Sequence, residues 1–86
     1  MQLDEKQILE DVSLRLRQLR LQKGYSSECL ANEIGINRSC MNRYENKQSN
    51  LTILSLHKIL AYHGISFQEF FAMTLDHQLL NQGLKK

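Results

Sequence analysis

One stretch of the sequence, residues 35–46, constrains the fold of this chain more than any other. Gly35 at its start can adopt the left-handed backbone conformation that commonly ends a helix. The side chain of Asn37 can accept a hydrogen bond from a free N–H group at the start of a following helix. The stretch therefore predicts a tight turn between two helices, with a short second helix that begins after Asn37.

The short helix expected after Asn37 has two different sides. Met41 and Tyr44 are three positions apart, so they share a side that can be buried. The other side is polar and consists of Arg38, Ser39, Asn42 and Arg43. Arginine and asparagine form paired hydrogen bonds with guanine and adenine edges in the DNA major groove. We therefore expect this helix to be inserted into the major groove.

The distribution of charge favours the same expectation. The chain has 86 residues and a formal net charge of +2. Residues 13–50 carry seven basic and three acidic side chains, a net charge of +4, whereas residues 1–12 have a net charge of −3. Positive charge is concentrated around the expected groove-binding helix, as a surface that faces phosphates requires.

The remaining sequence also predicts helices, and a chain of this length forms one small domain. Residues 5–23 carry an apolar stripe with helical spacing at Leu9, Val12, Leu16 and Leu19. Residues that stop or cap helices divide the chain further, at Gly24, Ser26 or Ser27, Gly35, Asn50 or Thr52, and Gly64. The core positions expected of the second and fourth helices are Leu30, Ala31, Ile34, Ile53, Leu56, Ile59 and Leu60.

A fifth helix is expected near the C-terminus. Ser66 and Glu69 have the spacing of a capping box, so the helix should begin there and run to about Leu80. It has more apolar residues than one buried side can hold, namely Phe67, Phe70, Phe71, Met73, Leu75, Leu79 and Leu80. We expect Phe67 and Phe71 to face the core. We expect Phe70, Met73 and Leu79 or Leu80 to form a homodimer interface, or to be covered by residues 1–12.

Other functional classes find little support in the sequence. No apolar run is long enough to span a membrane, and no signal peptide is visible. Cys29 and Cys40 are expected to be reduced thiols beside or within the core of a cytoplasmic protein. His57, His63 and His77 lack metal-ligand spacing to the cysteines, so neither a metal nor another cofactor is expected. No phosphate-binding loop or nucleophile–base arrangement suggests an enzyme.

Residues 13–71 contain a series of motifs without insertions between them, and these motifs carry a family resemblance. They are Arg15-Leu16-Arg17-Gln18-Leu19-Arg20, Lys23-Gly24-Tyr25-Ser26, Leu30-Ala31, Ile34-Gly35-Ile36-Asn37-Arg38-Ser39, Met41-Asn42-Arg43-Tyr44-Glu45, Leu56, Lys58-Ile59 and Gly64-Ile65-Ser66. In them the chain resembles the lambda Cro/CI-like (XRE) helix-turn-helix family of phage and bacterial repressors. The resemblance implies an all-α, five-helix, lambda-repressor-like DNA-binding domain. Residues 1–12 would extend the first helix, and residues 72–86 would form a dimerising helix extension and tail.

The resemblance also implies roles for individual residues in contacting DNA. The residues that match base-reading positions are Arg38, Ser39, Asn42 and Arg43. Ser27 stands where the family usually has a glutamine that contacts a phosphate. Asn46 and Lys47 match the loop that contacts the phosphate backbone, although the family usually has glycine at position 47. Asn37, which caps the recognition helix, completes the expected DNA-facing set.

Two further residues match a structural position rather than a DNA contact. In the resembled family, the positions of Arg20 and Glu45 form a partly buried ion pair between the first and third helices. We therefore expect Arg20 to be structural, although its charge would also suit DNA. Arg15, Arg17 and Lys23 are expected to be solvated or to contact phosphates weakly.

These observations together predict a transcriptional regulator that binds double-stranded DNA as a homodimer on a palindromic operator. A bacterial or phage repressor, a restriction-modification controller and a toxin-neutralising antitoxin all have about this size. The alternative is a protein-interaction module, with a partner such as a toxin, that keeps the fold but binds DNA weakly or not at all. The serine at position 27, Lys47 and the acidic residues 1–12 support that alternative.

Overall fold

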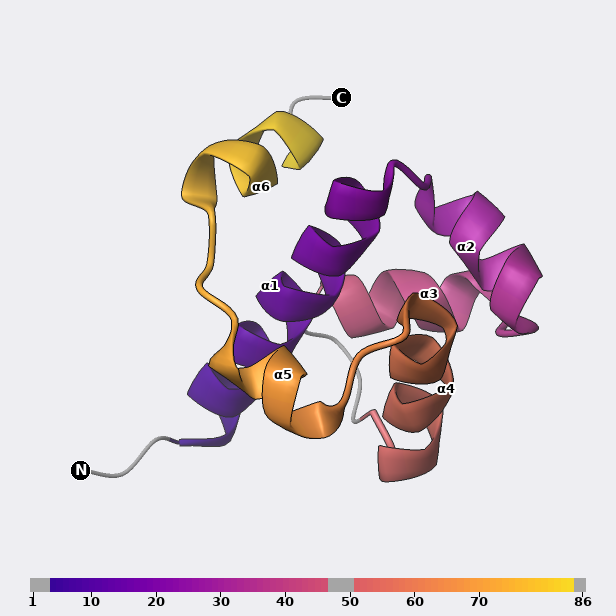
Figure 1. The fold of residues 1–86 in the computed structure, drawn as a ribbon, viewed down its shortest axis with the longest axis horizontal. Helices are drawn as coiled ribbons and strands as arrows, with labels where there is room; N and C mark the ends of the chain where they lie inside the picture. Colours follow the sequence, from indigo (N-terminus) through magenta and orange to yellow (C-terminus); the bar gives the residue numbers. More distant parts are fainter. Residues whose placement is uncertain (1–3, 47–50, 85–86) are drawn as a thin grey trace.

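Helices separated by short turns make up nearly all of the structure, a computed structural model that describes residues 4–46 and 51–84. No strand occurs within these two segments. The helices are α1 (Glu5–Lys23), α2 (Ser27–Ile34), α3 (Arg38–Glu45), α4 (Ile53–His63), α5 (Phe67–Ala72) and α6 (His77–Leu84). In Figure 1, α1 runs diagonally through the molecule, with α2, α3 and α4 to its right, α6 to its upper left and α5 beside its lower half.

Local capping interactions place the helix ends close to where the sequence predicts them. Asp4 caps α1 in a capping box with Gln7, which the sequence analysis did not identify. The predicted capping box of Ser66 and Glu69 is present at the start of α5. Of the two candidates for the α4 cap, Thr52 accepts the hydrogen bond, whereas Asn50 lies outside the described residues.

The core lies where α1 meets α2, α3, α4 and α5. Its buried residues are Leu16, Leu19, Leu30, Ala31, Met41, Leu56, Ile59, Leu60 and Phe70. Eight of them come from residues 16–60, inside the segment that the sequence assigns to the first four helices. Ile53 is an exception, because its side chain is 71% exposed instead of buried. No helix of the described chain is long and apolar enough to cross a membrane.

The C-terminal part of the chain has two helices where the sequence predicted a single one. α5 ends at Ala72, where the backbone becomes extended at Met73, so the described residues contain six helices instead of the expected five. Asp76 starts α6, because its carboxylate accepts hydrogen bonds from the backbone N–H groups of Gln78 and Leu79. Within residues 72–84, the expected helix extension is therefore a connecting segment followed by the separate helix α6. Gly83 lies within that helix rather than in a tail.

Two side chains of α1 hold the segment between α5 and α6. The guanidinium group of Arg15 donates hydrogen bonds to the carbonyl oxygens of Phe70 and Met73. The side-chain amide of Gln18 donates to the carbonyl of Thr74 and accepts from the N–H of Asp76. These bonds satisfy backbone groups that an uninterrupted helix would have satisfied itself. Arg15 is thus a structural residue and not the solvated arginine that we expected.

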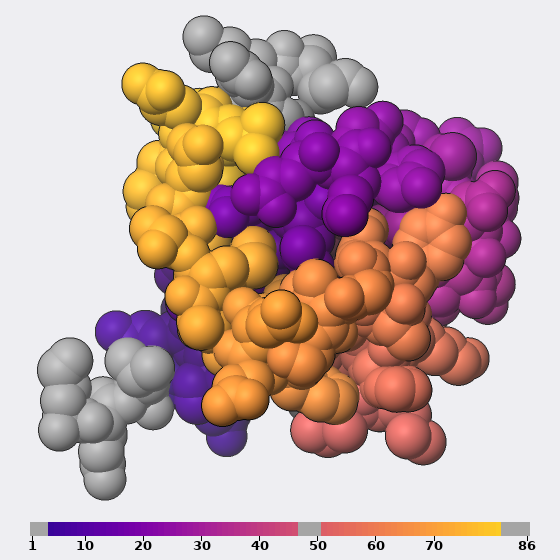
Figure 2. Space-filling model, viewed as in Figure 1, coloured from indigo at the N-terminus to yellow at the C-terminus, as the bar shows by residue number. Residues whose placement is uncertain are grey.

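The division of the C-terminal region also reverses the expected roles of its phenylalanines. Phe70 is fully buried in the core, whereas Phe67 is 38% and Phe71 is 48% exposed. Leu80 of α6 is buried too, at 3% exposure, and α6 packs along α1 (Figures 1 and 2). Phe70 and Leu80, both expected at a dimer interface, are therefore covered by the chain itself. Met73 and Leu79 are half-buried.

Candidate nucleic-acid interface

The outward side of α3 carries the four residues that the sequence singled out. Arg38, Ser39, Asn42 and Arg43 are all exposed. On the opposite side, Met41 is 1% exposed and belongs to the core, and Tyr44 packs against it. The predicted division of this helix into a buried apolar side and an exposed polar side is therefore present. Its exposed side presents hydrogen-bond donors and acceptors of the kinds that read base edges.

The turn between α2 and α3 sets the direction of α3. Gly35 has φ +82°, a conformation that side-chain-bearing residues rarely adopt, and its N–H donates to the carbonyl of Ala31. Asn37 then caps α3 by accepting a hydrogen bond from the N–H of Ser39. Ile36, between them, packs against the core. Asn37 is therefore committed to the cap through its side-chain oxygen.

The predicted ion pair between Arg20 of α1 and Glu45 of α3 is present. Arg20 donates three hydrogen bonds of 2.9–3.0 Å to the carboxylate of Glu45. Their side chains are 13% and 4% exposed, respectively. Arg20 also donates to the carbonyl of Tyr25 at 3.0 Å, at the start of the turn into α2. The charge of Arg20 is thus used inside the protein and not at its surface.

A polar cleft of about 370 Å³ brings Ser27 together with two of the α3 residues. Its lining includes Arg38 and Asn42 of α3, Ser27 and Glu28 of α2, and the end of α1 at Arg20. The first intrahelical hydrogen bond of α2 is donated by Leu30 to Ser26. The N–H groups that precede it are those of a helix N-terminus, which attracts anions such as phosphates.

The end of α3 makes hydrogen bonds within the protein that the sequence did not predict. Asn46 was expected to contact the DNA backbone, but its side-chain nitrogen donates to the carbonyl of Asn42 at 2.7 Å. Its side-chain oxygen accepts a 3.0 Å hydrogen bond from Arg17. Arg17, expected to be solvated or at a phosphate, also donates to the carbonyl of Glu45 at 2.9 Å. Lys47, the other predicted contact in this loop, lies outside the described residues.

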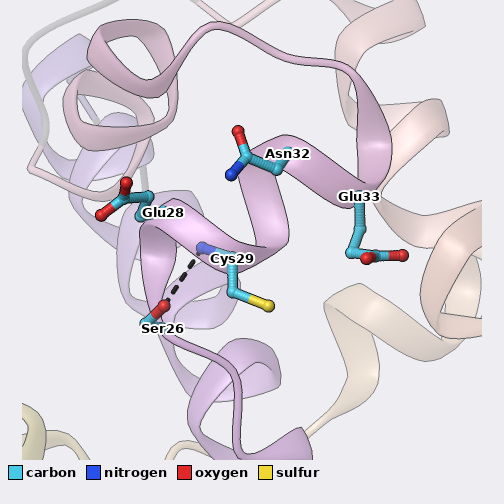
Figure 3. Close-up of a pocket in the computed structure, with 5 residues that line it drawn as sticks. All are labelled: Ser26, Glu28, Cys29, Asn32 and Glu33. Atoms are coloured by element: carbon cyan, nitrogen blue, oxygen red, sulfur yellow. Dashed lines mark hydrogen bonds between the residues drawn. The ribbon is translucent and has the colours of Figure 1, made fainter.

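Acidic side chains on the outward side of α2 border the polar surface that α3 and the start of α2 form. Figure 3 shows Glu28 and Glu33 at opposite ends of a shallow pocket that Cys29 also lines. Glu28 lies 3.8 Å from Arg38, and both side chains are mostly exposed. Cys29 is exposed rather than in or beside the core, and both cysteines are free thiols. Negative charge disfavours phosphate, so the surface suited to DNA consists of Ser27 at the start of α2 and the exposed side of α3, with Glu28 at its edge.

A separate, apolar groove of about 360 Å³ lies between the first half of α1, the start of α4 and α5. Its lining includes Ile8, Ile53 and Phe71. These side chains are 49%, 71% and 48% exposed. Leu54, next to Ile53, is 75% exposed. Sequence reasoning did not identify this surface, because helical spacing had assigned Ile53 and Phe71 to the core.

Comparison with known proteins finds similarity to helix-turn-helix proteins, both in sequence and in structure. The helix-turn-helix family model matches residues 16–70, and no curated protein sequence matches the chain. Among solved structures, the restriction-modification controller protein C.AhdI from Aeromonas hydrophila is 34% identical, with a TM-score of 0.70, over 74% of this chain and 97% of that one.

A second controller protein is equally similar. The wild-type restriction-modification controller protein C.Esp1396I is 32% identical, with a TM-score of 0.69, over 92% of this chain and 96% of that one. Its structure as a tetramer in complex with its natural 35 base-pair operator has a TM-score of 0.68 and the same identity of 32%, over 91% of this chain and 96% of that one.

Proposed function

This chain belongs to the helix-turn-helix family, in its XRE branch, and from that premise we propose that it is a regulator of the restriction-modification controller type. Like that family, it is a DNA-binding regulator and not an enzyme. The proposal goes further and states that it binds a palindromic operator as a homodimer. The observation that carries the proposal is the exposed polar side of α3. The helix is fixed in place by its buried apolar side and by the ion pair between Arg20 and Glu45.

The proposed reading of sequence uses Arg38, Ser39, Asn42 and Arg43. These residues occupy the two outward turns of α3, so they reach base edges when α3 enters the major groove. Arg38 has to release Glu28 to do so. This costs little, because the pair is 3.8 Å apart with side chains 66% and 60% exposed, and such pairs contribute about 0–1 kcal/mol.

The proposed contacts to the phosphate backbone come from the start of α2. Ser27 offers a hydroxyl group and stands at a helix N-terminus, beside the cleft that Arg38 and Asn42 also line. Such contacts position a protein on the duplex without reading its sequence. We keep Lys47 in this set for its charge. Asn46 stays in it through its side-chain nitrogen, which carries a second N–H besides the one donated to the carbonyl of Asn42; its backbone N–H is donated to the carbonyl of Arg43.

The proposed dimer forms through the apolar groove and not through Phe70 and Leu80, which are buried. Four large apolar side chains are exposed in or beside the groove, Ile8, Ile53, Leu54 and Phe71. A second copy of this chain fits such a surface, because a twofold interface uses the same patch on both subunits. The operator-bound assembly of C.Esp1396I, which is a tetramer, supports self-association. A toxin or other protein partner is not part of the proposal.

Selection of bound sequences from a random DNA pool tests the DNA-binding proposal. We expect two inverted half-sites about one DNA turn apart, a spacing of roughly 34–36 Å. Affinity for the selected operator should fall steeply with salt, because phosphate contacts release counterions. Arg43→Ala should relax preference at one base position and cost about 1–3 kcal/mol. Absence of DNA binding by an intact dimer at low salt would refute the proposal.

Sedimentation of Ile53→Glu tests the dimer surface. Because Ile53 is 71% exposed, the variant should fold normally and yet sediment as a monomer. Phe67→Glu is the matched control: Phe67 is exposed but does not line the groove, so this variant should remain dimeric. If Ile53→Glu stays dimeric, the interface lies elsewhere on the molecule.

A further inference from the structure

Three side chains of α1 contact three successive residues at the end of α3. Ser13 donates to the carbonyl of Tyr44 at 2.7 Å, and Arg17 donates to the carbonyl of Glu45 at 2.9 Å. Arg17 also donates to the side-chain oxygen of Asn46 at 3.0 Å. The third side chain, Arg20, forms the ion pair with Glu45. We call the contacts made by Ser13 and Arg17 the α3 clamp.

The spacing of the clamp follows from helix geometry. Residues 13, 17 and 20 are separated by four and three positions, so they lie on one side of α1. The last carbonyl groups of a helix have no partner within the helix, and Tyr44 and Glu45 carry two of those of α3. The guanidinium charge of Arg17 also stands at the negative end of the α3 dipole, which is favourable.

The clamp connects directly to the backbone of the proposed base-reading residues. Asn46, held by Arg17, donates its side-chain amide to the carbonyl of Asn42 at 2.7 Å. Its backbone N–H donates to the carbonyl of Arg43 at 3.2 Å. Arg17 therefore fixes Asn46, and Asn46 fixes the last turn of α3, from which Asn42 and Arg43 point outward.

From these contacts we propose that Ser13 and Arg17 are positioning residues that determine how precisely α3 reads DNA sequence. The proposal rests on the proposed function, because it assigns specificity to residues that touch no base. α3 has only eight residues and is fixed at its start by the turn and the Asn37 cap. Without the clamp, its last turn is held only by the Arg20–Glu45 pair and the packing of Tyr44, so it can shift, and Asn42 and Arg43 shift with it. Arg17 then serves sequence discrimination and not phosphate binding.

Ser13→Ala is the sharpest test, because Ser13 is neutral and 2% exposed. It cannot contact DNA, so any change in binding has to act through α3. We expect the ratio of operator to random-DNA affinity to fall by roughly three- to ten-fold, the scale of one lost hydrogen bond. We expect affinity for random DNA and the dependence on salt to stay unchanged. An operator preference within two-fold of wild type would overturn the assignment of Ser13.

Arg17→Met tests the charged member of the clamp, with Lys6→Met as the matched control. Lys6 is exposed in the first turn of α1, so the control removes the same charge from the same helix. For Arg17→Met we expect a roughly ten-fold loss of operator preference, the scale of one charge-assisted hydrogen bond, with an unchanged salt slope. Uniform weakening on all sequences, with the slope reduced by about one, would make Arg17 a phosphate contact and overturn the proposal.

Hydrogen exchange of the free protein separates failure of the clamp from failure of the proposed function. In both variants we expect amide exchange at the last turn of α3, residues 42–46, to accelerate relative to α4. Unchanged exchange there would overturn the clamp even if DNA binding were altered. If wild-type protein prefers no DNA sequence at all, the proposed function is wrong, while the exchange measurement still decides whether Ser13 and Arg17 hold α3.

Discussion

Replacing Glu45 with alanine should destabilise the protein far more than any change on its exposed surface. Glu45 is 4% exposed and receives three hydrogen bonds from Arg20, whose side chain is 13% exposed. The substitution removes the carboxylate but leaves the guanidinium group buried between α1 and α3. Its remaining hydrogen bond, to the carbonyl of Tyr25, does not neutralise the charge.

The expected magnitude follows from that remaining charge. Removing one partner of a buried ion pair costs about 3–5 kcal/mol, whereas the whole free energy of unfolding of a protein domain is about 5–15 kcal/mol. For a domain of this size, each kcal/mol lowers Tm by about 4–8 °C. Glu45→Ala should therefore lower Tm by about 12–40 °C, measured by the loss of helical circular dichroism on heating.

Two further variants show whether the cost comes from the buried charge. Glu28→Ala breaks the ion pair with Arg38, in which both side chains are at least 60% exposed, and should cost at most about 1 kcal/mol. In Arg20→Met/Glu45→Leu no buried charge remains, so the double variant should be more stable than Glu45→Ala. The reasoning is wrong if Glu45→Ala melts within a few degrees of wild type, or if the double variant regains no stability.

Three other predictions concern the core, pH and the charge beside α3. In urea denaturation, Phe70→Ala should cost about 3–5 kcal/mol because Phe70 is fully buried, and Phe71→Ala less than about 1 kcal/mol; equal costs would contradict the observed register of α5. Burial, and secondarily the charge of Lys23, lower the pKa of His63. Below about pH 6.5, the ordinary pKa of histidine, the unfolded state therefore binds a proton at His63 more readily than the folded state does. The contribution of His63 to the free energy of unfolding should be constant above this pH and should fall as the pH drops below it. In His63→Phe this part of the pH dependence of Tm should disappear. Glu28→Gln, measured by fluorescence anisotropy, should strengthen operator binding, because it removes a negative charge beside Arg38; weaker binding would mean that Glu28 itself positions Arg38.

Sequence alone could predict the features that depend on residues a few positions apart. The left-handed turn at Gly35, the cap at Asn37 and the capping box at Ser66 each involve groups within four residues. The two sides of α3 follow from helical spacing in the same way. The Arg20–Glu45 pair spans 25 positions, and only the resemblance to a known family made it predictable.

The limits of the sequence are clearest in α5 and α6. Aspartate is a common N-cap residue, so Asp76 is a local indication that a new helix begins there. The apolar residues around it favour instead a single helix that runs through this position. Which phenylalanine is buried then depends on where α5 stops. That point is set by Arg15 and Gln18, which bond to backbone groups 55–58 positions away.

The sequence by itself thus determined the helix-turn-helix and the polar side of α3, because caps, turns and helical spacing are local. Only the tertiary structure decided what the polar side chains of α1 do. Ser13 and Gln18 are 2% and 1% exposed, and Arg17 donates to the carbonyl of Glu45 at the end of α3. Apart from the side chain of Asn46, which Arg17 also contacts, these partners are backbone groups, which every residue has. No sequence pattern marks such partners, and a polar residue that bonds to them resembles a solvated one until the helices are packed.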